Sequence, residues 1–303
     1  MIHKIITALT FSLLVSGANA QQNAQFTQYL DNMLYYNPGY AGSRGQMNIT
    51  GTFRQQWVGF KGAPSTQSLS LHTPLKYEST SVGLTVLNDL VGPINQTWIN
   101  GSAAYAFRFK RNEAKLSFGV NGGINLINGD LTQLNVVDQD DPLAENYVNE
   151  IKPNIGAGIY FHSKKWFAGV SSPQLIENTS SLTNLGLNTQ RHYYLSFGGY
   201  FQVNRMLKIR PSTLVKVTDN APLAADMSLA FMFYDQLWVG ANYRLTESAG
   251  VFVQVQVNNQ FKLGYAFDLS TSELIRQNFG THELLLSYDF KFKKKSISSP
   301  RYF

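Results

Sequence analysis

The residues best suited to chemistry in this chain are its histidines, and their spacing fits no catalytic or metal-binding pattern. After the first 20 residues they are His72, His162, His192 and His282. They form no H-E-x-x-H zinc sequence, and no G-x-S-x-G sequence marks a serine nucleophile. The chain has no cysteine, which excludes disulfides, zinc-thiolate sites and cysteine nucleophiles. We therefore predict that the protein is not an enzyme and needs neither a cofactor nor a metal.

Carboxylates between residues 138 and 150 form the other candidate for ion binding. They are Asp138, Asp140, Asp141, Glu145 and Glu150. Such a group can hold a divalent cation or a basic partner, but its spacing lacks the glycine that a calcium-binding loop needs. We interpret the group as part of a solvated loop.

The elements that position these residues are predicted from a hydrophobic period of two. In residues 251–269, VFVQVQVNNQFKLGYAFDL, apolar and polar side chains alternate on both sides of a turn at Asn258 and Asn259. Successive side chains of a strand point to opposite faces, so the pattern predicts a hairpin with one apolar and one polar face. Fourteen alternating segments can be marked, at 46–55, 66–73, 80–89, 96–109, 113–127, 152–162, 164–170, 190–203, 206–218, 223–234, 236–246, 249–257, 260–268 and 282–292.

The connections between these segments fall into two classes of length. Connections after even-numbered segments are short, whereas those after odd-numbered segments are often long, as at 128–151 and 171–189. Outer-membrane barrels have short periplasmic turns and longer external loops. We therefore predict an all-β protein: an up-and-down antiparallel outer-membrane β-barrel of about 14 strands, crossing the membrane many times. An even number of strands predicts that both termini are periplasmic.

The composition favours a wall that faces lipid. Charged residues make up 15% of the chain and aromatic residues 13%, against roughly 25% charged residues in an average globular domain. A large soluble β-protein rich in tyrosine remains compatible with these values. The net charge of +6 lies largely in short turns and in the C-terminal KFKKKSISSPR. No basic helix or nucleic-acid-binding motif accompanies it, so outer-membrane lipid is a predicted partner and nucleic acid is not.

We divide the chain into four parts. Residues 1–20 read as a signal peptide, because a basic residue, a short apolar run and a small-x-small ending follow one another. Residues 21–45 carry apolar side chains at helical spacing that stops at Asn37 and Pro38, which predicts a short periplasmic or plug segment; a loose leader is the alternative. Residues 46–292 form the transmembrane β-barrel, and 293–303 form a basic C-terminal tail.

The polar faces of the strands would turn charged side chains into the lumen. These are Lys208, Arg210, Lys216, Asp226, Arg244, Lys262, Asp268, Glu283 and Asp289. They either pair with one another and close the lumen or line a conducting pore. We favour pairing.

The connection after the first segment has an unusual composition. Within FRQQWVGFKGAPSTQSLSLHTPL, residues 53–75, Trp57 is accompanied by Arg54, Gly59 and Pro64. Glycine-rich external loops with an aromatic residue can fold back into a lumen or present an anchor to a partner.

The same stretches resemble a known family. QYLDNMLYYNPGYAGS (28–43) followed by residues 53–75 is similar to the N-terminal signature of the PorP/SprF membrane proteins of Bacteroidetes, which are associated with type IX secretion and gliding motility. The resemblance continues in order through NDLVGP (88–93), AGVSSPQL (168–175), HYYLSFGGY (192–200), RPSTLVK (210–216), LWVGANYR (237–244), LGYAFDLS (263–270) and THELLLSYDF (281–290). The segment before the barrel departs mildly from the Met-Phe-Asn and Asn-Pro-Ala-Tyr motifs that are more usual in the family.

The resemblance implies a non-enzymatic outer-membrane barrel that supports secretion or surface attachment of a partner adhesin. It would do so by binding the C-terminal region of that secreted protein or subunits of the type IX translocon. We take Asn37, Pro38, Arg54, Trp57, Gly59 and Pro64 as candidate partner-binding residues. The alternatives are a passive porin or channel and a barrel hydrolase, which would need a hydroxyl, a histidine and an orienting group at one depth of the wall.

Overall fold

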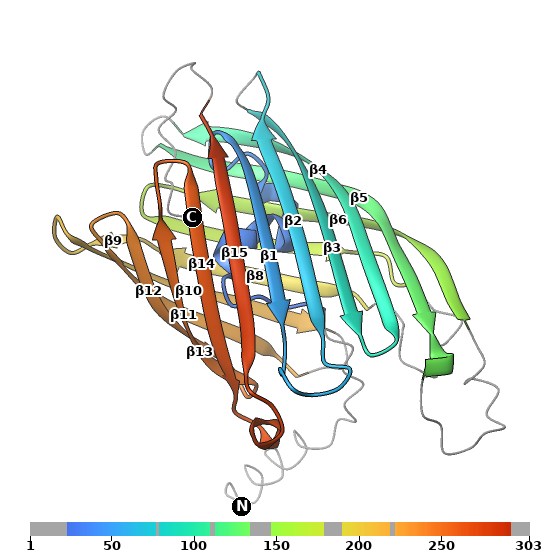
Figure 1. The fold of residues 1–303 in the computed structure, drawn as a ribbon. Coiled ribbons are helices and arrows are strands. Elements are labelled where there is room, and N and C mark those ends of the chain that lie inside the picture. The colour runs from blue at the N-terminus through green and yellow to red at the C-terminus, as the bar shows by residue number, and fades with distance from the viewer. Residues whose placement is uncertain are drawn as a thin grey trace, which may run out of the picture.

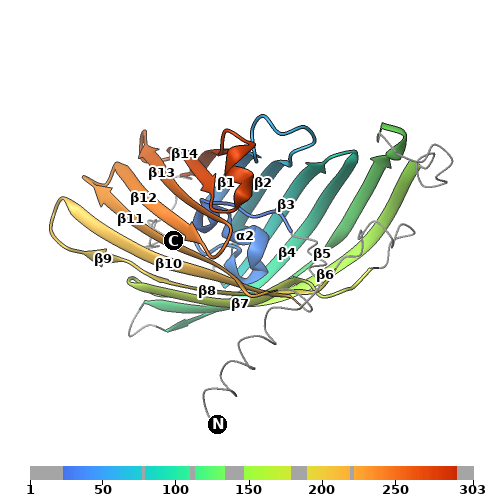
Figure 2. The same ribbon diagram turned by 90° about the horizontal axis from the view of Figure 1, so that it is seen from below.

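In the computed structural model the chain forms a closed antiparallel barrel around its own N-terminal segment (Figures 1 and 2). The structure describes residues 23–76, 79–109, 113–133, 147–178, 190–218 and 222–291. The predicted signal peptide, the basic tail and the carboxylates from Asp138 to Glu145 lie outside the described residues.

The wall consists of antiparallel strands, each paired with the strands before and after it. They are β1 (Met47–Gln55), β2 (Ser65–Pro74), β3 (Thr80–Val91), β4 (Ile94–Phe109), β5 (Ala114–Asp130), β6 (Tyr147–His162), β7 (Trp166–Gln174), β8 (His192–Gly199), β9 (Phe201–Gln202), β10 (Leu207–Thr218), β11 (Ala224–Phe233), β12 (Leu237–Arg244), β13 (Ser248–Gln256), β14 (Phe261–Ser270) and β15 (Thr281–Phe290). Because β8 and β9 both pair with β10, they act as one strand, and the described residues form a 14-strand barrel. Pairing of β1 with β15 closes it, which confirms the predicted fold class.

The apolar faces of the strands point away from the lumen. In β13, Val251 is 58% exposed whereas Gln254, on the opposite face, is 1% exposed. The same outward-facing apolar surface continues around the wall through Leu69, Phe107, Val120, Leu195, Leu229 and Leu284. A continuous apolar exterior around a largely polar interior is the arrangement of a barrel that crosses a membrane.

The two ends of the barrel differ in their connections. We call one end the long-loop rim; it carries the connections 56–64, 92–93, 131–146, 175–191, 219–223, 245–247 and 271–280. The other, the short-turn rim, carries 75–79, 110–113, 163–165, 203–206, 234–236 and 257–260. Connections after even-numbered barrel strands are short, as predicted. Those after odd-numbered strands are often long, although 92–93 and 245–247 are tight turns. The long-loop rim lies at the bottom of Figure 1.

The N-terminal segment lies inside the barrel, where Figure 2 shows α2 surrounded by the strands. We call residues 23–45 the plug. It contains only single turns of helix, namely η1 (Tyr29–Asn32), α2 (Met33–Tyr36) and η2 (Pro38–Tyr40); further short turns, η3 (Leu131–Gln133) and η5 (Glu273–Arg276), belong to the rim. Almost every residue from Phe26 to Arg44 is buried, so the plug and the inner wall form one core.

The core combines aromatic packing with hydrogen bonds. Tyr36 packs edge-on against Tyr194 of β8, and Tyr40 packs in the same way against Tyr160 of β6. The Tyr29 hydroxyl lies 2.7 Å from Ser212 Oγ of β10. Other apolar side chains of the plug and of the inner wall join this cluster, including Phe26, Met33, Trp98, Trp238 and Phe252. The lumen is therefore apolar where the plug's aromatic side packs and polar elsewhere.

Arg54 of β1 is the ionic centre of this core at the end near the long-loop rim. Its Nη1 lies 2.9 Å from Glu283 Oε2 and 2.9 Å from Asp268 Oδ2, and it donates to Thr27 Oγ1 of the plug at 2.8 Å. Glu283 also accepts the backbone N–H groups of Thr27 (2.8 Å) and Gln28 (2.9 Å). One cation thus holds two wall carboxylates, and the plug supplies the remaining donors.

The plug runs through the barrel from one rim to the other. Asn23 Nδ2 donates to Gln174 Oε1 at the long-loop end of β7 (2.9 Å), whereas Arg44 reaches Asp289 at the short-turn end of β15 (3.5 Å). The strand ends Met47 and Phe290 share the short-turn rim, as an even strand count requires. Asn23 and Lys291, the first and last described residues, nevertheless lie at opposite rims. The side on which the chain termini themselves lie stays a prediction, because residues 1–22 and 292–303 lie outside the described residues.

The path of the plug predicts that Asn23 and Lys291 are accessible from opposite sides of the membrane. The chain contains no cysteine, so Asn23→Cys and Lys291→Cys each give a single reactive site without background. A membrane-impermeant maleimide applied to intact cells should label one variant and leave the other unlabelled until the membrane is permeabilised. Equal labelling of both variants in intact cells would contradict the threaded path.

The Arg54 centre predicts a large loss of stability on Arg54→Met. Removing the cation leaves Asp268 and Glu283 buried without a counter-charge, which costs roughly 3–5 kcal/mol. Urea unfolding of the wild type and the variant in lipid vesicles measures this loss in the free energy of unfolding. The control is Lys164→Met, whose partner Glu113 lies 2.6 Å away in an ion pair with side chains 62% and 51% exposed; about 0–1 kcal/mol is expected there. Equal losses in the two variants would show that the Arg54 centre is not a stabilising contact.

Candidate functional site

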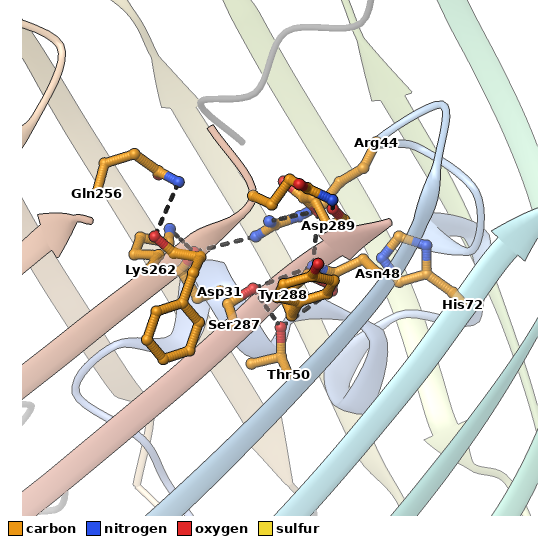
Figure 3. Close-up of polar contacts among 12 residues, drawn as sticks. Asp31, Arg44, Asn48, Thr50, His72, Gln256, Lys262, Ser287, Tyr288 and Asp289 are labelled. Atoms are coloured by element: carbon orange, nitrogen blue, oxygen red, sulfur yellow. Dashed lines mark hydrogen bonds and ion pairs between the residues drawn. The ribbon is translucent and has the colours of Figure 1, made fainter. Parts of the chain in front are cut away.

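A second ionic network holds the middle of the plug to β13 and β14 (Figure 3). Asp31 Oδ1 accepts from Lys262 Nζ of β14 and from Arg44 Nη2, the latter at 3.1 Å. Its other oxygen, Oδ2, accepts from Gln254 Nε2 of β13 at 2.8 Å. Asp31 and its partners are all buried, so the carboxylate is neutralised from both the plug and the wall.

Arg44 extends this network to β15 and β1 near the short-turn rim. Its Nη1 lies 3.5 Å from Asp289 Oδ1, which also accepts from Asn48 Nδ2 at 2.8 Å. Nearby, His72 Nδ1 accepts the backbone N–H of Gly42 at 3.2 Å. Figure 3 shows Asp31, Arg44, Asn48 and Asp289 converging between the plug and the wall. The network fixes the point at which the plug leaves the lumen and the chain turns into β1.

Asn37 and Pro38 hold the plug against β5 and β6. Asn37 Oδ1 accepts the N–H of Gly39 at 2.8 Å, and its Nδ2 donates to the carbonyl of Ile159 at 2.9 Å. The wall approaches closely here: a Cβ on Gly119 would lie 2.4 Å from the carbonyl carbon of Pro38. Glycine is required at such a contact because any side chain would displace the plug. Asn37 and Pro38 are therefore buried packing residues and are not accessible to a partner in this state.

The charges predicted to face the lumen largely pair, as we favoured. Arg244 Nε lies 2.7 Å from Asp226 Oδ1, Lys262 pairs with Asp31, and Asp268, Glu283 and Asp289 pair as described above. Lys208 pairs with Asp235 of the 234–236 turn. The guanidinium of Arg210 lies over the Trp238 ring, 4.3 Å from its centroid. In the described part of the barrel, the plug and these ion pairs therefore lie in the lumen between the two rims.

A cavity of about 460 Å³ lies at the long-loop rim, and we call it the vestibule. Its lining comes from the start of the plug, the ends of strands and the loops of this rim. The lining residues are Asn23, Ala24, Gln25, Arg54, Gln56, Trp57, Pro64, Asp89, Val91, Arg244, Thr246, Glu247, Ser248, Ser270, Ser272 and Thr281. Hydroxyls, carboxylates and one indole face the same space, and the plug forms part of the wall.

The loop 56–64 is braced against its neighbours. Trp57 adopts a left-handed backbone (φ 43°), rare for a bulky residue, and its N–H donates to Thr281 Oγ1 at 3.2 Å. Val58 exchanges backbone hydrogen bonds with the segment at Gly280, and Gly62 accepts the N–H of Gly92 at 3.0 Å. Connections from three hairpins are thereby linked into one rim, which presents Trp57 in a fixed position.

The structure separates the six candidate residues. Arg54, Trp57 and Pro64 line the vestibule. Gly59 lies outside its lining and allows the loop to pack on Phe279, since a Cβ there would lie 2.8 Å from Phe279 Cδ2. Asn37 and Pro38 lie deeper in the barrel, where they pack against β5 and β6.

Sequence reasoning missed several residues of the site. Gln25 and Glu247 line the vestibule, and Asp31 and Arg44 fix the plug. Asp31 is the lone carboxylate of the pre-barrel segment 21–45 and Arg44 the lone cation, a pairing that the composition of this segment could have indicated. Glu247 lies in a three-residue turn and carried no sequence signal.

Over the described ranges, no three His, Cys, Asp or Glu side chains are grouped so as to hold a metal ion. No helix in the described residues is long and apolar enough to cross a bilayer. His282 contacts the Tyr265 hydroxyl at 2.7 Å, and His192 Nδ1 contacts the carbonyl of Gln190 at 2.9 Å.

The chain matches several solved structures at low sequence identity. Omp33 of Acinetobacter baumannii is 10% identical, with 81% of this chain and 98% of that chain covered and a TM-score of 0.44. A FadL homologue of Pseudomonas aeruginosa is 11% identical, with 81% and 90% covered and a TM-score of 0.45. The KdgM porin, solved in complex with disordered oligogalacturonate, is 10% identical, with 80% and 99% covered and a TM-score of 0.38.

Comparison with curated proteins gives no match. The family model for "Type IX secretion system membrane protein PorP/SprF" matches residues 18–288. This range contains the plug, all strands up to β14 and most of β15, and it confirms the resemblance found in the sequence. The chain therefore belongs to the PorP/SprF family of type IX secretion system membrane proteins.

Proposed function

We propose that this protein is a non-enzymatic outer-membrane barrel that receives a secreted adhesin-like protein at its long-loop rim. It would bind the C-terminal region of that partner, or a translocon subunit carrying it, and so support secretion or surface attachment. Family membership supports the type IX context, and the vestibule with Trp57 supports the place of docking. Gliding motility would then depend on the partner that is attached.

The observation that carries this proposal is the buried plug inside the lumen. The plug is held by the Arg54 and Asp31 networks and by apolar side chains, of which Phe26, Leu30, Met33 and Leu34 are all buried. Each such side chain contributes up to about 1.5–3 kcal/mol, so these four oppose loss of the plug by roughly 6–12 kcal/mol as an upper value. A barrel whose plug stays seated acts through its surfaces, and the rims are the surfaces outside the membrane.

Orientation follows from the rims. Outer-membrane barrels place short turns in the periplasm, so we propose that the short-turn rim and Lys291 are periplasmic. Asn23 would then lie on the outer side, within the vestibule. The predicted cleavage after Ala20 would leave two residues before Asn23.

Trp57→Ala is expected to lower recovery of the partner. A buried aromatic anchor at a protein interface is worth about 2 kcal/mol or more, which corresponds to a loss of affinity of roughly 25-fold or greater. To measure the loss, the barrel is crosslinked in the native outer membrane and purified by affinity. The proteins that accompany it are then quantified by mass spectrometry.

The matched control for this experiment is Trp166→Ala. Trp166 lies at the short-turn rim and packs on Phe197 and Phe201, so its removal deletes an indole without touching the vestibule. A large surface protein or translocon subunit should be recovered with the wild type and with Trp166→Ala. Undiminished recovery with Trp57→Ala, at equal barrel abundance, would remove the vestibule from the proposal.

The channel alternative makes the opposite prediction for conductance. With the plug in place, purified protein in planar bilayers should show no steady current. A stable open current from the wild-type protein would favour the passive porin instead, because ions would then pass through the barrel with its plug in place.

A further inference from the structure

We propose that the vestibule is a binding site for a lysine or arginine residue within a partner polypeptide. This inference rests on the proposed function, since it names the chemistry of the group that docks there. It follows from the charges around the cavity, from buried polar atoms of its lining and from Trp57.

Negative charge dominates around the vestibule. Asp89 and Glu247 line it directly. Asp268 and Glu283 lie behind Arg54, both at 2.9 Å, and Asp226 lies behind Arg244 at 2.7 Å. The cations of this region are Arg54, Arg244 and Lys216, the last of which interacts electrostatically with Glu247.

The two arginines that line the cavity are already neutralised. Arg54 contacts two carboxylates, and Arg244 contacts Asp226 as well as Glu247, whose Oε2 lies 3.7 Å from Arg244 Nε. In and directly behind the lining there are thus five carboxylates and three cations. An incoming carboxylate would meet net repulsion. Lys61 and Arg276 are exposed on the two long loops of this rim but are not part of the lining. The group favoured inside the vestibule is a cation.

Buried polar atoms of the lining provide a second, independent indication of a ligand. In the described part of the chain, Ser248 Oγ and Gln25 Oε1 have no hydrogen-bond partner, and both can accept from an ammonium or guanidinium group. Arg54 Nε, Arg244 Nη2 and Gln25 Nε2 are likewise unpaired buried donors, suited to main-chain carbonyl oxygens. A residue with a cationic side chain and a peptide carbonyl satisfies both sets.

Trp57 completes the chemistry. Its indole lines the same cavity as Glu247 and Asp89, and an indole face attracts a cation more strongly than other aromatic rings do. A volume of about 460 Å³ suits a short stretch of polypeptide and not a folded domain. The free C-terminal carboxylate of a partner is not the group expected to enter.

The test uses a single cysteine as a probe of the local potential. Ser272→Cys places a thiol in the vestibule, and Asn259→Cys places one in the 257–260 turn at the opposite rim; both positions are exposed. Purified barrel is reacted with a trimethylammonium-ethyl and with a sulfonatoethyl methanethiosulfonate, of equal size and opposite charge. The cation-to-anion rate ratio should be about tenfold higher at Ser272→Cys than at Asn259→Cys. An equal or lower ratio in the vestibule overturns the inference.

Two further variants link this ratio to the named residues. Glu247→Gln should lower the ratio severalfold, whereas Glu113→Gln, an exposed carboxylate at the short-turn rim, should leave it unchanged. Tetralysine amide should protect Ser272→Cys from the neutral methyl reagent, and tetraglutamate should not. Equal protection by both peptides, or no effect of Glu247→Gln, would also count against a cationic site.

The outcomes for the two proposals can be told apart. A cation-selective vestibule without recovery of a secreted protein from crosslinked membranes would leave this inference standing and remove the docking role. If instead a partner is recovered in a Trp57-dependent way but the vestibule shows no preference for cations, the docking role stands and this inference falls.

Discussion

The buried carboxylates of the wall are the constraint on which the rest of the structure depends. Glu283 and Asp268 point into a space that has little solvent, where an uncompensated charge costs several kcal/mol. Arg54 supplies the counter-charge, and the N–H groups of Thr27 and Gln28 complete the hydrogen bonds to Glu283. The wall therefore needs the plug as much as the plug needs the wall. The plug and the wall share one set of polar contacts, and a barrel without residues 23–45 would lose the two N–H donors that Glu283 accepts.

The wall could be predicted from the sequence because it depends on a local pattern. Alternation in a stretch such as 251–257 decides which side chains face outward without reference to any other strand. The plug could not be placed in this way. Its contacts join residues far apart in the chain, as when Thr27 meets Glu283 or Asp31 meets Lys262, and no local period encodes such pairs. Trp238 and Phe252, apolar residues on the inward face, are explained only once the plug packs on them.

The site was predictable in part for the same reason. Trp57 and Pro64 stood out by composition within one loop, and both line the vestibule. Asn37 and Pro38 stood out equally but serve packing, because Gly119 brings the wall against them. Composition identifies unusual residues without telling an exposed one from a buried one. That distinction depends on whether the segment lies inside the barrel, which strand counting did not address.

The passage of the plug from rim to rim connects the two proposals physically. Asn23, Ala24 and Gln25 belong both to the plug and to the lining of the vestibule. A ligand that contacts them binds only the state with the plug seated, so by mass action it stabilises that state. Docking at the long-loop rim would therefore tighten a segment whose other end is fixed by Arg44 and Asp289 near the short-turn rim. If a partner docks there, the plug would be the route by which its binding at one rim stabilises contacts at the other.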